Sequence, residues 1–245
     1  MAMFGPGEKT IEIHIQDDLQ SYGAFEIGLE QDAAVWPKEN PNRFKMTFEG
    51  DSICQGSFFS GGNPRFRLDR IVAEMIGCDH HYNNAVGGTG SISDLSGTKT
   101  TYAQRFAGVQ EFGSDIHVIC GFHNDTGNSG AFTSASRRAA FLSYLQQCRT
   151  NLPKATIVLL GALPLRGDLI APGDLSLHQV ELDAKFAFDT FADANSLFIP
   201  IFTSSRQRIT STAVGRFFMN ATAPYSDGHP TPVFYYAMGQ FIAEK

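Results

Sequence analysis

The chain has 245 residues, 42% of them apolar and 18% charged, which is enough for one α/β domain with a full hydrophobic core. Its net charge of −6 offers no basic surface for phosphate groups, so nucleic acid is not an expected partner. No apolar run approaches the roughly 20 residues that span a bilayer, and the first residues lack the charged and apolar regions of a signal peptide. We therefore expect a soluble protein without a membrane span. The sequence predicts no particular location in the cell and no particular oligomeric state.

The first 41 residues differ from the rest of the chain. Residues Thr10–Ile15 and Ala24–Leu29 alternate apolar and polar side chains, which is typical of half-buried strands. A connector rich in proline and asparagine, Trp36–Asn42, follows them and favours turns. We expect an N-terminal antiparallel β segment over residues 1–41 and a main domain over residues 42–245.

In the main domain, apolar strands alternate with helical stretches, which favours a mostly parallel sheet covered on both faces. The expected strands are Phe44–Phe48, His80–Asn83, Ile116–Cys120, Thr156–Leu160 and Leu197–Ile201. The expected helices are Arg65–Ile76, Tyr102–Phe106, Ser134–Asn151, His178–Ala194 and Pro232–Ala243. This order predicts an α/β fold with a five-stranded, doubly wound sheet, in which ligands bind beyond the carboxyl ends of the strands.

The cysteines and histidines give no sign of a metal or a cofactor. The four cysteines have no CxxC spacing and are too few for a disulfide scaffold, so we expect buried thiols. The pair His80 and His81 has no carboxylate or cysteine at ligand spacing. The chemistry described next requires neither a metal nor a cofactor.

Four short segments carry the residue types of a serine hydrolase, and each falls at a predicted strand end or in a late loop. They are Gly50-Asp51-Ser52, Gly87-Gly88-Thr89-Gly90, Gly121-Phe122-His123-Asn124-Asp125 and Asp227-Gly228-His229-Pro230. Ser52 is the candidate nucleophile, and a serine hydroxyl needs a base that takes its proton. The alternative is that Asp51 or Ser52 is simply the N-cap of a helix.

His229 is the candidate base, because an imidazole can accept the serine proton and return it to the leaving group. Asp227, two residues earlier, can orient the imidazole and stabilise its cationic form. The alternative is a turn at Ser226-Asp227-Gly228 followed by the start of the last helix. The two interpretations are compatible.

An oxyanion pocket is the third requirement, since the tetrahedral intermediate of ester hydrolysis carries a negative oxygen. The candidate donors are the N–H groups of Ser52 and Gly88 and the side-chain amide of Asn124. The alternatives are a flexible turn at residues 87–90 and an Asx-turn at Asn124. His123 and Phe122 are weaker candidates for contact with the substrate.

The four segments resemble the four sequence blocks of the SGNH hydrolase superfamily, the GDSL-type esterases and lipases, from about Phe44 to the C-terminus. The resemblance implies a flavodoxin-like three-layer sandwich, Ser52 as nucleophile, Asp227 and His229 as its triad partners, and Ser52, Gly88 and Asn124 as oxyanion donors. The chain departs from the family pattern in its fourth block: Asp227 lies two residues before His229 rather than three, and Ser226 takes the usual place.

The function that follows is a serine esterase that removes a short acyl group, with acetyl favoured, through an acyl-Ser52 intermediate. The segment Tyr22–Leu29 resembles the end of the β-domain that precedes some bacterial carbohydrate esterases of this superfamily. The resemblance implies that residues 1–41 are the stub of a small β-domain or strands that dock on the hydrolase, and it makes a saccharide ester a candidate substrate beside a small-molecule ester. The alternatives are a lipase-like or thioesterase activity, an acyltransferase, and a non-catalytic binding module on the same fold.

Overall fold

A computed structural model describes residues 44–56, 67–78, 80–95, 97–126, 132–163, 175–201 and 232–244 of the chain. The expected N-terminal β segment and its boundary at residues 41 and 42 lie outside these residues.

The centre of the fold is a five-stranded sheet whose strands are all parallel, in the order β2-β1-β3-β4-β5. The strands are β1 (Lys45–Glu49), β2 (His80–Asn83), β3 (Ile116–Ile119), β4 (Thr156–Leu160) and β5 (Ser196–Ile199). All five predicted strands are confirmed, with shifts of no more than two residues at their ends.

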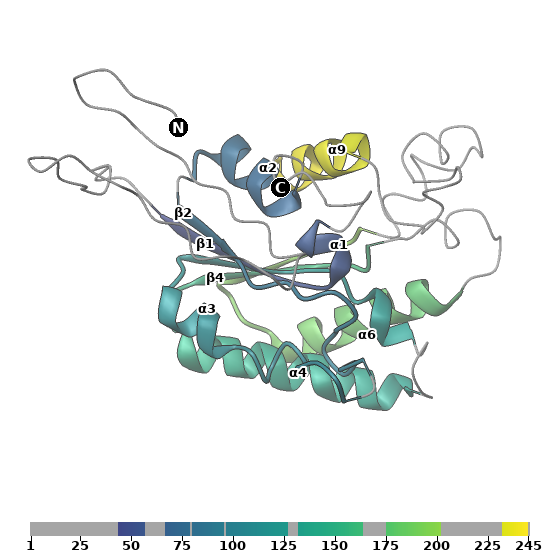
Figure 1. Cartoon of the computed structure of the whole chain (residues 1–245). Helices are drawn as coiled ribbons and strands as arrows, with labels where there is room; N and C mark the ends of the chain where they lie inside the picture. The colour runs from purple at the N-terminus through teal and green to yellow at the C-terminus, as the bar shows by residue number, and fades with distance from the viewer. Residues whose placement is uncertain are drawn as a thin grey trace, which may run out of the picture.

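Helices cover both faces of this sheet and form a three-layer sandwich (Figure 1). One face carries α1 (Ser52–Gln55), α2 (Leu68–Ile76) and α9 (Pro232–Ala243). The other face carries α3 (Ala107–Phe112), α4 (Ser134–Asn151) and α6 (Leu175–Phe191). A short 3-10 helix, η2 (His123–Thr126), follows β3. The predicted flavodoxin-like α/β class is thus confirmed.

Burial on both faces explains why the strands are so apolar. In β4, Ile157 and Leu159 pack into the core on the side of α4 and α6, while Val158 and Leu160 pack into the core on the side of α2 and α9. A strand covered by helices on both faces has no solvent-facing side and reads as a continuous apolar run. This is the pattern that identified the parallel sheet in the sequence.

One predicted helix is wrong, and the ends of two others are shifted. Residues 102–106 form turns, and α3 begins only at Ala107, because the side chains of Tyr102 and Arg105 are held by tertiary hydrogen bonds to other loops. The predicted helix Arg65–Ile76 is observed as α2, which begins at Leu68 after the extended residue Arg67. The predicted helix His178–Ala194 is observed as α6, which ends at Phe191 because Ala192 adopts a left-handed conformation (φ 48°). No described helix has the length and apolarity needed to cross a membrane.

The strand order places a switch in winding direction between β1 and β3. The chain passes from β1 outward to β2, and then returns past β1 to β3 on the other side. In open parallel sheets, ligands bind at the carboxyl ends of the strands where the winding reverses. The segments after β1 and after β3 therefore meet at the place where the fold favours a site.

Candidate active site

Ser52 follows β1 and is the first residue of the short helix α1. Asp51 is the N-cap of this helix, because its Oδ1 accepts a hydrogen bond from the Ile53 N–H at 3.0 Å. The N-cap interpretation thus applies to Asp51, and Ser52 is left for another role. Asp51 is buried, whereas Ser52 is partly exposed.

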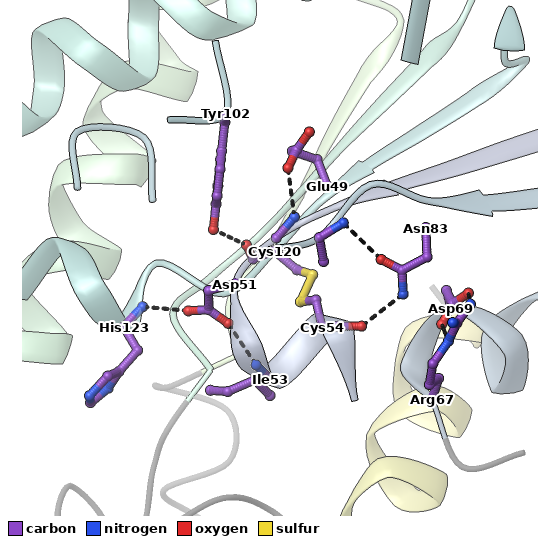
Figure 2. The surroundings of a disulfide bond; sticks show 12 residues. Glu49, Asp51, Ile53, Cys54, Arg67, Asp69, Asn83, Tyr102, Cys120 and His123 are labelled. Carbon is purple, nitrogen blue, oxygen red and sulfur yellow. Dashed lines mark hydrogen bonds and ion pairs between the residues drawn. A yellow bond between two sulfur atoms is a disulfide. The ribbon is translucent and has the colours of Figure 1, made fainter. Parts of the chain in front are cut away.

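Asp51 also joins the nucleophile segment to the segment after β3. Its Oδ2 accepts a hydrogen bond from the His123 N–H at 3.1 Å, and Figure 2 shows the carboxylate between the two chain segments. A Cβ at Gly121 would lie 2.6 Å from the Asp51 Cγ, and Gly121 has a positive φ of 95°. Only glycine permits this approach of the two segments.

A disulfide between Cys54 of α1 and Cys120 at the end of β3 crosses the same junction (Figure 2). The two Cα atoms are 6.7 Å apart. The expectation of buried thiols is confirmed for Cys78 and Cys148 and is wrong for this pair. The pairing depends on β1 and β3 being neighbours in the sheet, which the spacing of 66 residues does not reveal.

The glycine-rich segment after β2 lies directly against the nucleophile. A Cβ at Gly87 would lie 3.3 Å from the Ser52 Cβ, and the Gly87 N–H donates to Gln55 Oε1 of α1 at 2.8 Å. Gly88 has a left-handed backbone with φ 83°. Its N–H donates no hydrogen bond within the described residues. The donor that the sequence assigned to the oxyanion pocket is therefore available.

Asn124 lies on the other side of this segment. Its Nδ2 donates one hydrogen bond to the Thr89 carbonyl at 3.0 Å, across 35 residues of sequence. This long-range contact is not the local Asx-turn that was the alternative. The second Nδ2 hydrogen has no acceptor within the described residues. Ser52, Gly88 and Asn124 are all partly exposed, while Asp51, Thr89 and Asp125 behind them are buried.

Asp125 holds the loop that carries Gly88. Its carboxylate accepts hydrogen bonds from the backbone N–H groups of three successive residues, at 2.9 to 3.1 Å, from Ser91, Ile92 and Ser93. A Cβ at Gly90 would lie 2.2 Å from the Asp125 Oδ1, so the loop is packed directly onto the carboxylate. The sequence contained Asp125 within the third segment but gave no indication of this role.

Burial perturbs the carboxylates around the site. It raises the pKa of Asp51 to about 7, against the opposing effect of the hydrogen bonds from Ile53 and His123. It raises the pKa of Asp125 to about 6, again opposed by its three backbone donors. Such clustered shifts are characteristic of functional sites, although structural networks produce them as well.

The two candidates for contact with the substrate, His123 and Phe122, differ in burial. His123 is partly exposed beside Asn124 and faces the same end of the sheet. Phe122 is fully buried, and its ring packs 4.9 Å from that of Phe141, so it contributes to the core. Its φ of 64° turns the chain sharply after β3. Asp227 and His229 lie outside the described residues.

Three of the four sequence segments thus converge at the switch point. They bring the Ser52 hydroxyl, the Gly88 N–H and the Asn124 amide to one end of the sheet. The buried residues Asp51, Thr89 and Asp125 hold these segments by hydrogen bonds. This arrangement suits acyl transfer through an oxyanion intermediate. A sequence model of the GDSL-like Lipase/Acylhydrolase family matches residues 48–235. A comparison with curated protein sequences finds no significant match.

Solved structures show the same fold. The chain is similar to a carbohydrate esterase family 2 enzyme with a carbohydrate binding domain from Corynascus thermopiles (Myceliophthora fergusii), at 20% identity and a TM-score of 0.65, over 86% of this chain and 67% of that one. It is similar to a lipase/acylhydrolase from Enterococcus faecalis at 16% identity and a TM-score of 0.60, over 82% and 94% of the chains. It is also similar to an acetyl xylan esterase from Butyrivibrio proteoclasticus at 15% identity and a TM-score of 0.56, over 87% and 66%. The chain spans about two thirds of the length of both carbohydrate esterases.

The family match extends over more than half of the chain, and the chain therefore belongs to the GDSL-like lipase/acylhydrolase family. The predicted class, a serine hydrolase acting on carboxylic ester bonds, is confirmed at the level of this family.

Proposed function

We propose that this protein is an esterase that removes short acyl groups, with acetyl esters of saccharides as the substrate class. The observation that carries the proposal is the contact of the Gly88 segment with Ser52 through Gly87 and with Asn124 through Thr89. Within the described residues, the Gly88 N–H and the second Asn124 Nδ2 hydrogen have no acceptor. The structural similarity to carbohydrate esterases, one of them an acetyl xylan esterase, supports the saccharide and the acetyl group.

In the proposed reaction, His229 takes the proton of Ser52 Oγ as this oxygen attacks the ester carbonyl carbon. The carbonyl oxygen becomes negative and accepts hydrogen bonds from the Ser52 and Gly88 N–H groups and from Asn124 Nδ2. The bond to the leaving alkoxide then breaks, and the alkoxide takes the proton from His229. Water attacks the acyl-serine with His229 as base, which releases the carboxylic acid and regenerates the hydroxyl.

Asp227 is the proposed partner of His229 in this scheme. A carboxylate on Nδ1 fixes the tautomer that leaves Nε2 free to accept a proton, and it stabilises the imidazolium. No metal and no cofactor takes part in the proposed steps.

The test compares p-nitrophenyl acetate with p-nitrophenyl octanoate, and acetylated xylo-oligosaccharides with their deacetylated forms as product standards. We expect turnover that favours acetate, release of acetate from the oligosaccharide, and loss of at least about 1000-fold in kcat in Ser52→Ala. Ser143→Ala makes the same chemical change at an exposed position on α4 and should retain full activity.

Each alternative has its own outcome in this experiment. A preference for octanoate would replace the short-acyl proposal with a lipase-like one. Transfer of acetyl to an added alcohol in preference to water would indicate an acyltransferase. Turnover retained in Ser52→Ala would reject the mechanism, and a folded protein inactive on every ester would favour a binding module.

A further inference from the structure

Arg105 lies behind the site, and every hydrogen-bond donor of its guanidinium is used. Its Nε donates to the Asn84 carbonyl at 3.0 Å. Its Nη1 donates to Thr89 Oγ1 at 2.9 Å and to the Thr100 carbonyl at 2.7 Å. Its Nη2 donates to Glu49 Oε1 and to the Gly50 carbonyl at 2.8 Å. A guanidinium has five N–H donors in a fixed plane, so these five acceptors are held in one rigid arrangement.

Two of the five acceptors, the Gly50 carbonyl and the Thr89 hydroxyl, belong to segments that carry the proposed oxyanion donors. Gly50 lies two residues before Ser52, and Thr89 directly follows Gly88. The Thr89 hydroxyl makes two hydrogen bonds: it accepts from Arg105 Nη1 and donates to the Val86 carbonyl at 2.7 Å. The two bonds fix the turn in which Gly88 presents its N–H.

Thr89 also connects Arg105 to the third donor. The Thr89 carbonyl accepts one hydrogen of Asn124 Nδ2, and this bond decides where the other hydrogen points. Because an amide group is planar, fixing one N–H direction fixes the second. Arg105 thus acts on Gly88 and on Asn124 through the same residue.

The guanidinium of Arg105 is largely buried, and an ion pair with Glu49 balances its charge. The Arg105 side chain is 9% exposed and that of Glu49 is fully buried. The second oxygen of Glu49 accepts from Asn84 Nδ2 at 2.6 Å, and the guanidinium also stacks 4.8 Å from the centre of the Tyr102 ring. A buried charge that is paired and fully hydrogen-bonded is rigid, and removal of any one part is costly.

We infer that Arg105 is a positioning residue that aims the three oxyanion donors of the active site, through Gly50, Thr89 and Asn124. The inference rests on the proposed function, since it concerns the pocket that this function requires. Arg105 does not contact the proposed reacting atoms. Its contribution is to hold donors where the negative oxygen forms, which is most important in the transition state.

Two substitutions test the inference at different points of the network. Arg105→Lys keeps the charge but has only three donors for five acceptors. Thr89→Val removes the hydroxyl with little change of shape, and Thr89→Ser retains the hydroxyl as the conservative control. Steady-state kinetics with p-nitrophenyl acetate give kcat and KM for each variant, and a fluorophosphonate titration of the reactive serine gives the concentration of competent sites.

Arg149→Lys is the matched control. Arg149 has a comparable set of contacts, with Asp193 and the carbonyls of Leu152, Pro153, Ala155 and Asn195, but these lie where β4 and β5 begin, at the opposite end of the sheet. Its substitution removes a similar number of hydrogen bonds from the fold. It should lower Tm and leave kcat per titrated site within about twofold of wild type, because the oxyanion donors are not displaced.

For Arg105→Lys and Thr89→Val we expect kcat per titrated site to fall at least about tenfold with KM changed less than about threefold, because misaligned oxyanion donors lower transition-state binding alone. Thr89→Ser should recover most of kcat. If Arg105→Lys does not fold, Thr89→Val and Thr89→Ser decide the question. Wild-type kcat per site in Thr89→Val or in a folded Arg105→Lys protein, or a rise in KM alone, would overturn the inference.

The Ser52→Ala protein separates this inference from the proposed function. If Ser52→Ala is inactive and the Arg105 and Thr89 variants have wild-type kcat, only the positioning role is rejected. If Ser52→Ala remains active, the proposed function fails, and the positioning role fails with it.

Discussion

At the level of single residues, the site is divided into exposed groups and buried supports. Ser52, Gly88 and Asn124 are partly exposed, and each is adjacent in sequence to a buried polar residue: Asp51, Thr89 and Asp125. The buried neighbour uses its hydrogen-bonding capacity on the fold. The Gly88 N–H and one Asn124 Nδ2 hydrogen have no acceptor within the described part of the chain. This division gives each segment a structural and a chemical function at once.

The sequence predicted the exposed residues better than their supports. Ser52, Gly88 and Asn124 stand in recognisable motifs, and their three segments contact one another through Gly87 and Thr89. The catalytic roles of the three residues stay a prediction. Arg105 stands in no motif, and the chain around it read as an ordinary helix. Its role depends on acceptors from five separate positions, and only the folded chain brings these together.

The shortened spacing of the fourth segment leads to a prediction for Asp227. Asp227→Asn should lower kcat on p-nitrophenyl acetate by roughly 1000-fold, because an amide can hold the His229 ring in the wrong tautomer and cannot stabilise the imidazolium. Ser226→Ala is the matched control and should retain activity. The reverse result, a large loss in Ser226→Ala and a small one in Asp227→Asn, would assign the third position to Ser226.

At the level of elements, the contrast between strand and helix predictions has a physical origin. A parallel strand covered on both faces is mostly apolar, so β4 is visible in composition alone. β1 and β3 also contain buried polar residues, Thr47, Glu49 and His117. The four-residue helix α1 has no periodicity to detect, and its start is set by the capping carboxylate of Asp51. The turns at residues 102–106 likewise follow from tertiary contacts rather than from local propensity.

One buried histidine, His117 of β3, connects its strand to the neighbouring strand β1 and to the helix α4. His117 of β3 is fully buried, with Nδ1 2.8 Å from Thr47 Oγ1 of β1 and Nε2 3.2 Å from the Tyr144 hydroxyl of α4. Burial lowers the pKa of His117 to about 3. The pKa of Tyr144 is raised well above 10 by burial, so this partner remains neutral.

This histidine should make the free energy of unfolding depend on pH. Its folded pKa is depressed, so the unfolded state takes up a proton below pH 6.5 while the folded state does not until about pH 3, and stability is lost as the pH falls through this window. Urea unfolding of wild type and His117→Gln at pH 7, 6, 5 and 4 measures it. The stability of wild type relative to the variant should fall by roughly 1 kcal/mol per pH unit below pH 6.5. A difference independent of pH would contradict the assignment.

At the level of the whole molecule, the sheet order explains why distant segments form one site. The order β2-β1-β3-β4-β5 puts the carboxyl ends of β1, β2 and β3 side by side, and the first three segments follow these strands. The disulfide and the Asp51 bridge fasten the first segment to the third, and Arg105 fastens the first to the second. The fold thus supplies the position, and a small set of buried polar residues supplies the alignment.

The proposed function depends on transfer of an acyl group to Ser52 during turnover. The most direct measurement is rapid acid quenching of the protein with p-nitrophenyl acetate, followed by peptide mass spectrometry. We expect a single acetyl group on the peptide that contains Ser52, formed within the time of one turnover and absent from Ser52→Ala. Turnover without any acyl-protein, or an acetyl group on a different residue that forms as fast as product, would contradict it.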